Sequence, residues 1–218
     1  PKGPHLAPAH RGADFRGWPD PTMMTESIEP LSDPTPLRRS SIGARLAAYA
    51  GRIDPAWFAF FASLVLSAIA YWRSDCPNLD GILYIETAEI YAQQGWAAAR
   101  EHFDWIFFPV GIAWLARLTG LGFEAAAYAL SALFVAGACA TLVRISRRQF
   151  AGAAWCACLV ALALPAFNGY RDFVIREFGF WFFCLLAILA ALRWSSRPSW
   201  RGGLAVQACL FAGSLFRV

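Results

Sequence analysis

Two groups of charged residues, far apart along the chain, have the types and settings that transfer chemistry needs. The first is centred on Asp80, which follows a long apolar run by a few residues. Its carboxylate would lie at a membrane surface, where it could take a proton from an acceptor hydroxyl or amine as a general base. Asn78 and Asp80 are also both good N-cap residues, so Asp80 could instead begin a helix. The two roles do not exclude each other.

The second group comprises Arg171-Asp172 and Arg176-Glu177, in and just after a short polar segment between apolar runs. Charged side chains at a membrane boundary are costly unless they are exposed or paired, and they often mark a functional site. The two arginines could clamp a phosphate, because a guanidinium donates two parallel hydrogen bonds to oxygen atoms. Asp172 could orient an acceptor or hold Arg176. A structural Arg–Glu pair at a helix end is the alternative.

His102 and Asp104 could face the same cleft as Asp80, although a lone histidine near aromatic residues is more often structural than a ligand. The aromatic residues of this region fit the belt found at membrane interfaces, and sugar rings also stack on such side chains. They are Tyr71, Trp72, Tyr91, Trp96 and Trp105. The sequence contains no phosphate-binding glycine loop, nucleophile elbow or metal-ligand helix. It identifies no cofactor, and a need for a divalent metal is not readable from it.

The composition indicates what must hold these residues. Of the 218 residues, 58% are hydrophobic and only 16% are charged, whereas globular domains usually have about 45–50% and about 25%. This excess predicts burial in a bilayer. The 19 basic residues are scattered in small groups, without the basic, aromatic-interleaved face of a nucleic-acid-binding protein, so no nucleic-acid partner is expected. The chain begins at Pro1 and stops inside an apolar run, and we expect it to be a piece of a longer protein.

The apolar runs predict an all-α integral membrane protein with about five transmembrane helices. Residues 1–54 are rich in Pro, Gly, Ser and charge, which predicts a disordered cytoplasmic tail, and 55–218 would form the membrane-embedded module. Uncharged runs near the length that crosses about 30 Å of hydrocarbon set the spans. The predicted spans are 55–72, about 123–143, about 150–167, about 176–194 and about 202–216. The dozen uncharged residues of 105–116 better fit an interfacial or re-entrant helix.

Arginines set the expected orientation, because the positive-inside rule places them in the cytoplasm. They precede the first span, follow the second and separate the fourth from the fifth. A long acidic segment, about 73–122, and a short one, about 168–175, are then left on the outer face. Spacings of three and four residues from Asp80 to Trp96 predict one amphipathic surface helix in the long segment, ended by Gly95. A second would run from Phe108-Pro109 to Thr119, before Gly120.

The order of these features resembles the N-terminal module of the GT-C glycosyltransferases. The matching residues, after the first span, are Asp80-Gly81-Ile82-Leu83-Tyr84, Ala88, Gly95-Trp96, His102, Phe108-Pro109 and Arg171-Asp172. Within that class the chain looks most like the bacterial relatives of the protein O-mannosyltransferases and the lipid A aminoarabinose transferases. It departs from the family pattern in having one proline, where relatives often have two, at the start of the second surface helix. It also lacks the arginine that is common at the start of the second span.

The resemblance implies an inverting transfer of a sugar from a polyprenyl-phosphate or polyprenyl-diphosphate carrier. The acceptor would be a lipid, a glycan or a protein at the outer face of a bacterial inner membrane. Asp80 would be the base, with Asp75 as the nearby competitor, and Asp172 would assist. Arg176 and Arg171 would stabilise the phosphate as it leaves. The other substrate-binding residues that the resemblance implies are Tyr84, His102 and Glu177. Later spans would complete the donor pocket, so this piece alone is expected to be inactive.

A fragment of a polytopic transporter or flippase is the alternative, with Asp80, Arg171 and Arg176 lining a substrate path. Transporters seldom carry a long acidic loop with two surface helices between their first two spans, and they more often place broken helices at the membrane midplane. A non-catalytic membrane scaffold is a third interpretation.

Overall fold

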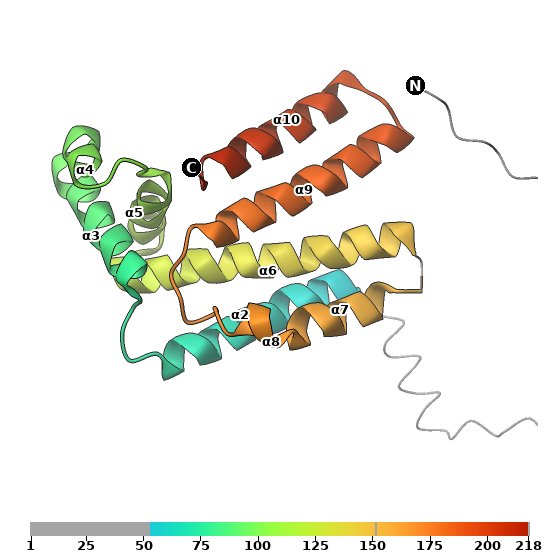
Figure 1. Cartoon of the computed structure of the whole chain (residues 1–218), viewed down its shortest axis with the longest axis horizontal. Helices are drawn as coiled ribbons and strands as arrows, with labels where there is room; N and C mark the ends of the chain where they lie inside the picture. Colours follow the sequence, from blue (N-terminus) through green and yellow to red (C-terminus); the bar gives the residue numbers. More distant parts are fainter. Residues whose placement is uncertain (1–52, 151, 218) are drawn as a thin grey trace, which may run out of the picture. The chain divides into compact units, whose positions relative to one another are not determined.

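The computed structural model describes residues 53–150 and 152–217, and helices joined by short connections make up this part of the chain (Figure 1). The described residues belong to one compact unit. The predicted tail, residues 1–54, lies outside the described residues except for its last two positions.

Three helices are long and apolar enough to cross a membrane: α2 (Pro55–Arg73), α6 (Phe123–Gln149) and α9 (Glu177–Ser196). They coincide with the first, second and fourth predicted spans and support a multi-pass membrane protein. The start of α2 shows why the helix begins there. Pro55 occupies its first position, and the Asp54 carboxylate accepts a hydrogen bond of 2.8 Å from the backbone N–H of Ala56. Both features are favourable at a helix N-terminus.

Small side chains bring α6 close to the helices around it. One buried cluster joins α2, α6, α7 and α9, and its members are Ala56, Ala59, Val135, Cys139, Val143, Ala154, Cys158, Ala161 and Phe178. A Cβ atom on Gly137 would lie 2.6 Å from the ring of Phe182, so α9 approaches α6 as closely as a glycine allows. On the opposite side of α2, Phe61, Val65 and Ile69 recur every four residues and are exposed. This apolar stripe fits a lipid-facing surface.

Helices occupy both ranges predicted for surface helices, and a short helix lies between them. They are α3 (Leu79–Gln94), α4 (Trp96–His102) and α5 (Phe107–Thr119). Gly95 and Gly120 end α3 and α5 with φ values of 88° and 75°, in the region that favours glycine. A second buried cluster, which includes Tyr84, Phe108 and Ile112, packs α3 and α5 against the start of α6.

The third predicted span is shorter than expected, and the fifth coincides with a helix of the expected length. The prediction of a continuous helix over 150–167 is wrong: α7 (Ala154–Ala163) is followed by a break and then by α8 (Pro165–Asn168). At 1.5 Å per residue, α7 covers only about 15 Å. The break falls at Pro165, which lacks a backbone N–H and disfavours the helical conformation of the residue before it; Leu164 is extended, with ψ 112°. The last helix, α10 (Trp200–Ser214), has 15 residues.

The helices form a bundle with two chemically different ends (Figure 1). The loop end, at the left of the figure, carries α3 to α5, residues 169–176 and the end of α10. The basic end, at the right, carries the start of α2, the ends of α6 and α9, and the start of α10. A hydrogen bond fixes the end of α10 at the loop end. Trp105 Nε1 donates it to the carbonyl of Leu215, at 2.7 Å. The next residue, Phe216, packs its ring against those of Phe108 and Phe134.

Candidate functional site

A hydrogen bond joins the segment before α3 to residues 169–176, two segments that the sequence predicts to lie on the same face of the membrane. The backbone N–H of Val174 donates to Oδ1 of Asn78, which precedes α3, at 2.8 Å. Val174 is fully buried. A Cβ atom on Gly81 would lie 2.9 Å from Cβ of Val174 and 2.8 Å from Oδ1 of Asn78. This close fit fixes residues 169–176 against the first turn of α3.

Asp80 lies in that first turn and is exposed. The N-cap position belongs to Asn78, so the alternative interpretation of Asp80 as the cap is wrong. Asn78 itself makes no side-chain capping bond, since its oxygen accepts the hydrogen bond from Val174. The Asp80 carboxylate is therefore open to solvent, at a helix end whose dipole favours negative charge.

Tyr84 lies within electrostatic reach of charged residues from both segments. Tyr84 follows Asp80 by one turn of α3, and its side chain is buried. Burial raises the pKa of Tyr84 to about 12, while the charge of Arg176 lowers this pKa and the carboxylates of Asp80 and Glu177 raise it. Three charged groups from two distant segments therefore act on one phenol.

Aromatic rings hold Arg176 in this place. Its guanidinium lies 5.9 Å from the centre of the Phe103 ring, within the range of a cation–π interaction. The rings of Phe103 and Phe108 in turn pack edge-on against Tyr84, with centroids 5.6 and 5.3 Å away. The aromatic cluster thus places the positive charge of Arg176 on the side of Phe103, whose ring packs against Tyr84, one helical turn after Asp80.

Arg171, which the sequence pairs with Arg176, makes different contacts. It is 5% exposed. Its Nη1 donates to the carbonyl and the hydroxyl of Ser63, at 3.0 and 2.9 Å, and to the hydroxyl of Ser67 at 2.9 Å. Ser63 lies near the middle of α2, so this guanidinium reaches deep into the bundle. These contacts favour a structural role for Arg171.

Asn168 connects Arg171 to the break after α7. Its side-chain oxygen accepts a hydrogen bond from Nε of Arg171. Its amide nitrogen donates to the carbonyls of Leu162 and Leu164, at 2.7 and 2.9 Å. Carbonyls at a helix end need such partners. A continuous set of hydrogen bonds therefore joins the end of α7, the outer segment and α2, and it positions the stretch that leads to Arg176.

Sequence reasoning missed this set of hydrogen bonds. The available signal was Ser63 and Ser67, two hydroxyls one helical turn apart in an otherwise apolar span. Polar side chains at that spacing in a span indicate a buried polar partner.

The other predicted carboxylates have surroundings of their own. Asp172 is half-buried, and its charge reaches Tyr128, whose hydroxyl lies 3.2 Å from that of Ser74. Asp75 is exposed in the connection between α2 and α3.

His102, at the end of α4, makes a contact of its own. Its Nε2 lies 3.7 Å from a carboxylate oxygen of Glu86. Of the predicted site residues, Asp80, Arg176 and Glu177 thus act electrostatically on Tyr84, whereas His102 contacts Glu86. Among the residues that the structure describes, no three His, Cys, Asp or Glu side chains form a group that could hold a metal ion. Comparisons with protein-family models, with curated proteins and with solved structures found no match to this chain.

Proposed function

We propose that the chain is part of a membrane glycosyltransferase of the GT-C type. In this proposal the enzyme moves a sugar from a polyprenyl-phosphate carrier to a lipid, glycan or protein acceptor at the loop end. The observation that carries the proposal is that the charges of the exposed Asp80 and of Arg176 both act on the buried Tyr84. An acceptor base next to a cation for the departing phosphate is the minimum that such a transfer requires.

The proposed reaction is a single displacement. The Asp80 carboxylate takes the proton of the acceptor hydroxyl as the acceptor oxygen bonds to the anomeric carbon. The bond from that carbon to the carrier phosphate breaks, and the phosphate keeps the electron pair. Attack opposite to the leaving group inverts the configuration. Because a lipid phosphate is already a fair leaving group, the main contribution of the protein is the electrostatic stabilisation that Arg176 provides.

The remaining residues are assigned supporting roles. Asp172 and Glu177 orient the acceptor or Arg176, and Asp75 and His102 line the approach to the site. Arg171 was expected to bind phosphate; its contacts with Ser63, Ser67 and Asn168 make it, in the proposal, a positioning residue.

An apolar groove supports a lipid-linked donor. It has a volume of about 470 Å³ and lies between α6, α7 and α9, lined by Ala138, Cys139, Leu142, Val160, Ala161, Leu164, Trp181, Cys184 and Leu185. Cys139 also neighbours Arg171, so the groove reaches the contacts that hold the outer segment. We assign the polyprenyl chain to it, since an apolar groove in a membrane domain fits an isoprenoid better than a sugar.

One observation favours a transporter instead. The break between α7 and α8, with Arg171 inside the bundle, is similar to the discontinuous helices around which transporters build their sites.

Reconstitution of the full-length protein in vesicles distinguishes the two functions. A polyprenyl-phosphate-linked sugar is supplied with lipid acceptors, and the polyprenyl phosphate that is released is measured by mass spectrometry. A transferase releases the carrier and glycosylates an acceptor. Movement of the intact donor across the vesicle without cleavage would reject the transferase and support the transporter.

A further inference from the structure

We propose that the basic end carries a binding site for the phosphodiester headgroup of an anionic phospholipid. The site lies at the opposite end of the bundle from Asp80 and Arg176, and it does not depend on the proposed transferase activity. Three features support this binding site: the arginines of α6 and α9, the cavities that these arginines line, and the apolar side chains beside them.

Arginines line two cavities at the basic end. The smaller, about 450 Å³, is bordered by Asp54, Arg144, Arg147, Arg148, Leu189 and Arg193. The larger, about 710 Å³, shares Arg148 and Arg193 and adds Arg197. Each cavity is large enough for a headgroup, and each presents several guanidinium groups, the side chains best suited to bidentate recognition of phosphate oxygens.

The carboxylates do not balance these arginines. Asp54 is the one acidic residue at the basic end among the residues that the structure describes, and Oδ2 of Asp54 is 2.9 Å from Nη1 of Arg147. All the other described acidic residues belong to the loop end or its connections, from Asp75 to Glu124 and at Asp172 and Glu177. The cavities therefore have an excess of positive charge that a phosphate anion would neutralise.

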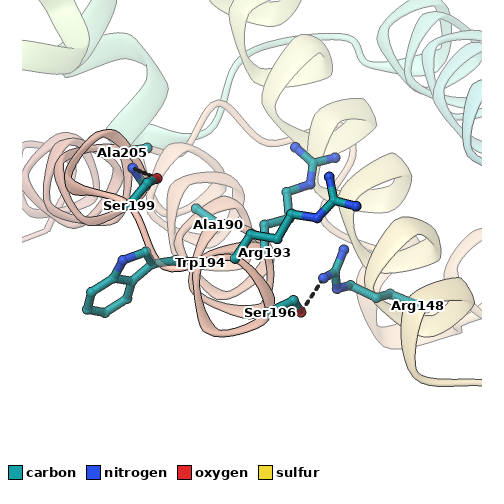
Figure 2. A pocket seen from close by; sticks show the side chains of 9 residues that line it. Arg148, Ala190, Arg193, Trp194, Ser196, Ser199 and Ala205 are labelled. Carbon is teal, nitrogen blue, oxygen red and sulfur yellow. Dashed lines mark hydrogen bonds between the residues drawn. The ribbon is translucent and has the colours of Figure 1, made fainter.

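The larger cavity is built by contacts between helices (Figure 2). Nη2 of Arg148 donates a 2.6 Å hydrogen bond to the hydroxyl of Ser196, which joins the last turn of α6 to the last turn of α9. Across the turn, the Ser199 hydroxyl caps α10 by accepting from the backbone N–H of Gly202 at 3.1 Å. The Trp194 ring covers Gly202 so closely that a Cβ there would lie 2.7 Å from it. The arginines are thus presented from one packed corner of the fold.

Apolar side chains also line the larger cavity. Ala190 and Ala205 form part of its wall together with Trp194. Trp194 and Trp200 are exposed and lie next to Arg193 and Arg201 in the sequence, where an aromatic belt is expected. A cationic cavity with apolar side chains in its lining matches a phospholipid, with its phosphate on arginine and its acyl chains along the helices. Basic pockets between membrane helices bind anionic headgroups in this way.

Free phosphate has the same anionic chemistry as the headgroup. The apolar part of the lining favours the lipid, because a small hydrated anion gains nothing from Ala190, Trp194 or Ala205.

The test uses the full chain in neutral detergent and the probes dioctanoyl phosphatidylglycerol, dioctanoyl phosphatidylcholine and inorganic phosphate. Binding is followed by native mass spectrometry and by the rise in melting temperature. We expect saturable binding of phosphatidylglycerol, weakened about tenfold or more by Arg193→Gln because each charge-assisted hydrogen bond contributes that much. Arg193→Lys should retain part of the binding. The matched control Arg117→Gln, an exposed arginine at the loop end, should leave it unchanged.

Three results would overturn the proposal. Equal binding of phosphatidylglycerol and phosphatidylcholine would show that charge does not direct the lipid. An equal loss in Arg193→Gln and Arg117→Gln would show that binding follows net charge alone. Saturation by inorganic phosphate with no competition from phosphatidylglycerol would make the cavity a site for a free anion. Loss of phosphatidylglycerol binding in Arg193→Gln, with unchanged melting of the lipid-free protein, would support the proposed headgroup site.

Discussion

Among the residues that the structure describes, the two ends of the bundle have equal numbers of arginines and use them differently. In this part of the chain the basic end has six arginines and one carboxylate: Arg144, Arg147, Arg148, Arg193, Arg197, Arg201 and Asp54. The loop end and its connections have six with nine carboxylates: Arg73, Arg100, Arg117, Arg171, Arg176, Arg217, Asp75, Asp80, Glu86, Glu89, Glu101, Asp104, Glu124, Asp172 and Glu177. At the loop end Arg171 and Arg176 are packed against serines and aromatic rings. At the basic end arginines line open cavities.

The difference shows that surroundings decide what an arginine does. At the loop end, the segment after the break between α7 and α8 packs back against the bundle. Hydroxyl, amide and aromatic groups are therefore available there to hold a guanidinium. At the basic end, where the helices end, Arg147 pairs with Asp54 and Arg148 donates to Ser196, and both arginines also border cavities. A positive charge that has a fixed place can act on a reacting group, whereas one in an open cavity can bind a mobile anion.

The largest expected effect on stability comes from breaking the contacts of Arg171. Arg171→Met removes the donor to Ser63, Ser67 and Asn168 and leaves buried hydroxyls without their partner. We expect a loss of about 3 kcal/mol in the free energy of unfolding, measured by chemical denaturation in detergent and circular dichroism. Arg197→Met at the basic end, where the side chain is exposed, should change it by less than about 0.5 kcal/mol. Equal effects would remove the distinction between the two ends.

A glycine comparison tests the close fit at the loop end. In Gly81→Ala the new Cβ would meet Val174 and Asn78 at 2.9 and 2.8 Å, so the outer segment must shift, at a cost of about 1–3 kcal/mol. Gly203→Ala, in α10 near the basic end, would meet nothing closer than 3.8 Å. This substitution should stabilise the protein by up to about 1 kcal/mol, because alanine has a higher helix propensity than glycine. The melting temperatures of both variants measure these effects. A Gly81→Ala protein that melts like the wild type would contradict the close fit of Gly81 against Val174 and Asn78.

The acid response of the basic end depends on Asp54. Burial raises its pKa, but the hydrogen bonds from Arg147 and Ala56 and the charge of Arg147 outweigh this and leave the pKa below its usual range. A lowered pKa in the folded state gives stability that is present above the unfolded pKa and is lost as the pH falls through the folded one, below about pH 4.

Acidification should destabilise the protein in part because Asp54 becomes protonated. Asp54→Asn should therefore remove that part of the stability loss. The expected change is at most about 1 kcal/mol, since both partners are more than a third exposed. Melting temperatures of the two proteins between pH 3 and 6 provide the measurement. An identical loss on acidification would show that the Asp54 and Arg147 pair contributes nothing.

The smallest effect expected is a change in the pKa of Tyr84. Asp80→Asn removes a negative charge that raises it, so this pKa should fall, and Arg176→Gln removes a positive charge that lowers it, so it should rise. Phenolate absorbance at high pH, taken as the difference from Tyr84→Phe, reports the titration. An unchanged pKa in both variants would mean that the two charged groups do not meet at Tyr84. This readout needs no enzymatic activity.

The sequence predicts the long helices well, because uncharged runs and arginines at their ends are local signals. Gly95 and Gly120 likewise mark the ends of α3 and α5. The break at Pro165 was missed since the apolar run continues through it, and hydropathy does not report a missing N–H. The separation of Arg171 from Arg176 was also missed. Their spacing suggests one clamp, but Ser63 and Ser67 on a distant helix hold only Arg171.

The most direct test of the central claim is sugar transfer by the full-length protein with Asp80→Asn. Glu89→Gln, which changes an exposed carboxylate on the same helix, is the matched control. We predict that release of polyprenyl phosphate from the sugar-linked donor falls by at least about a hundredfold in Asp80→Asn and is unchanged in Glu89→Gln, with both proteins melting like the wild type. Undiminished release in a folded Asp80→Asn protein would contradict the account.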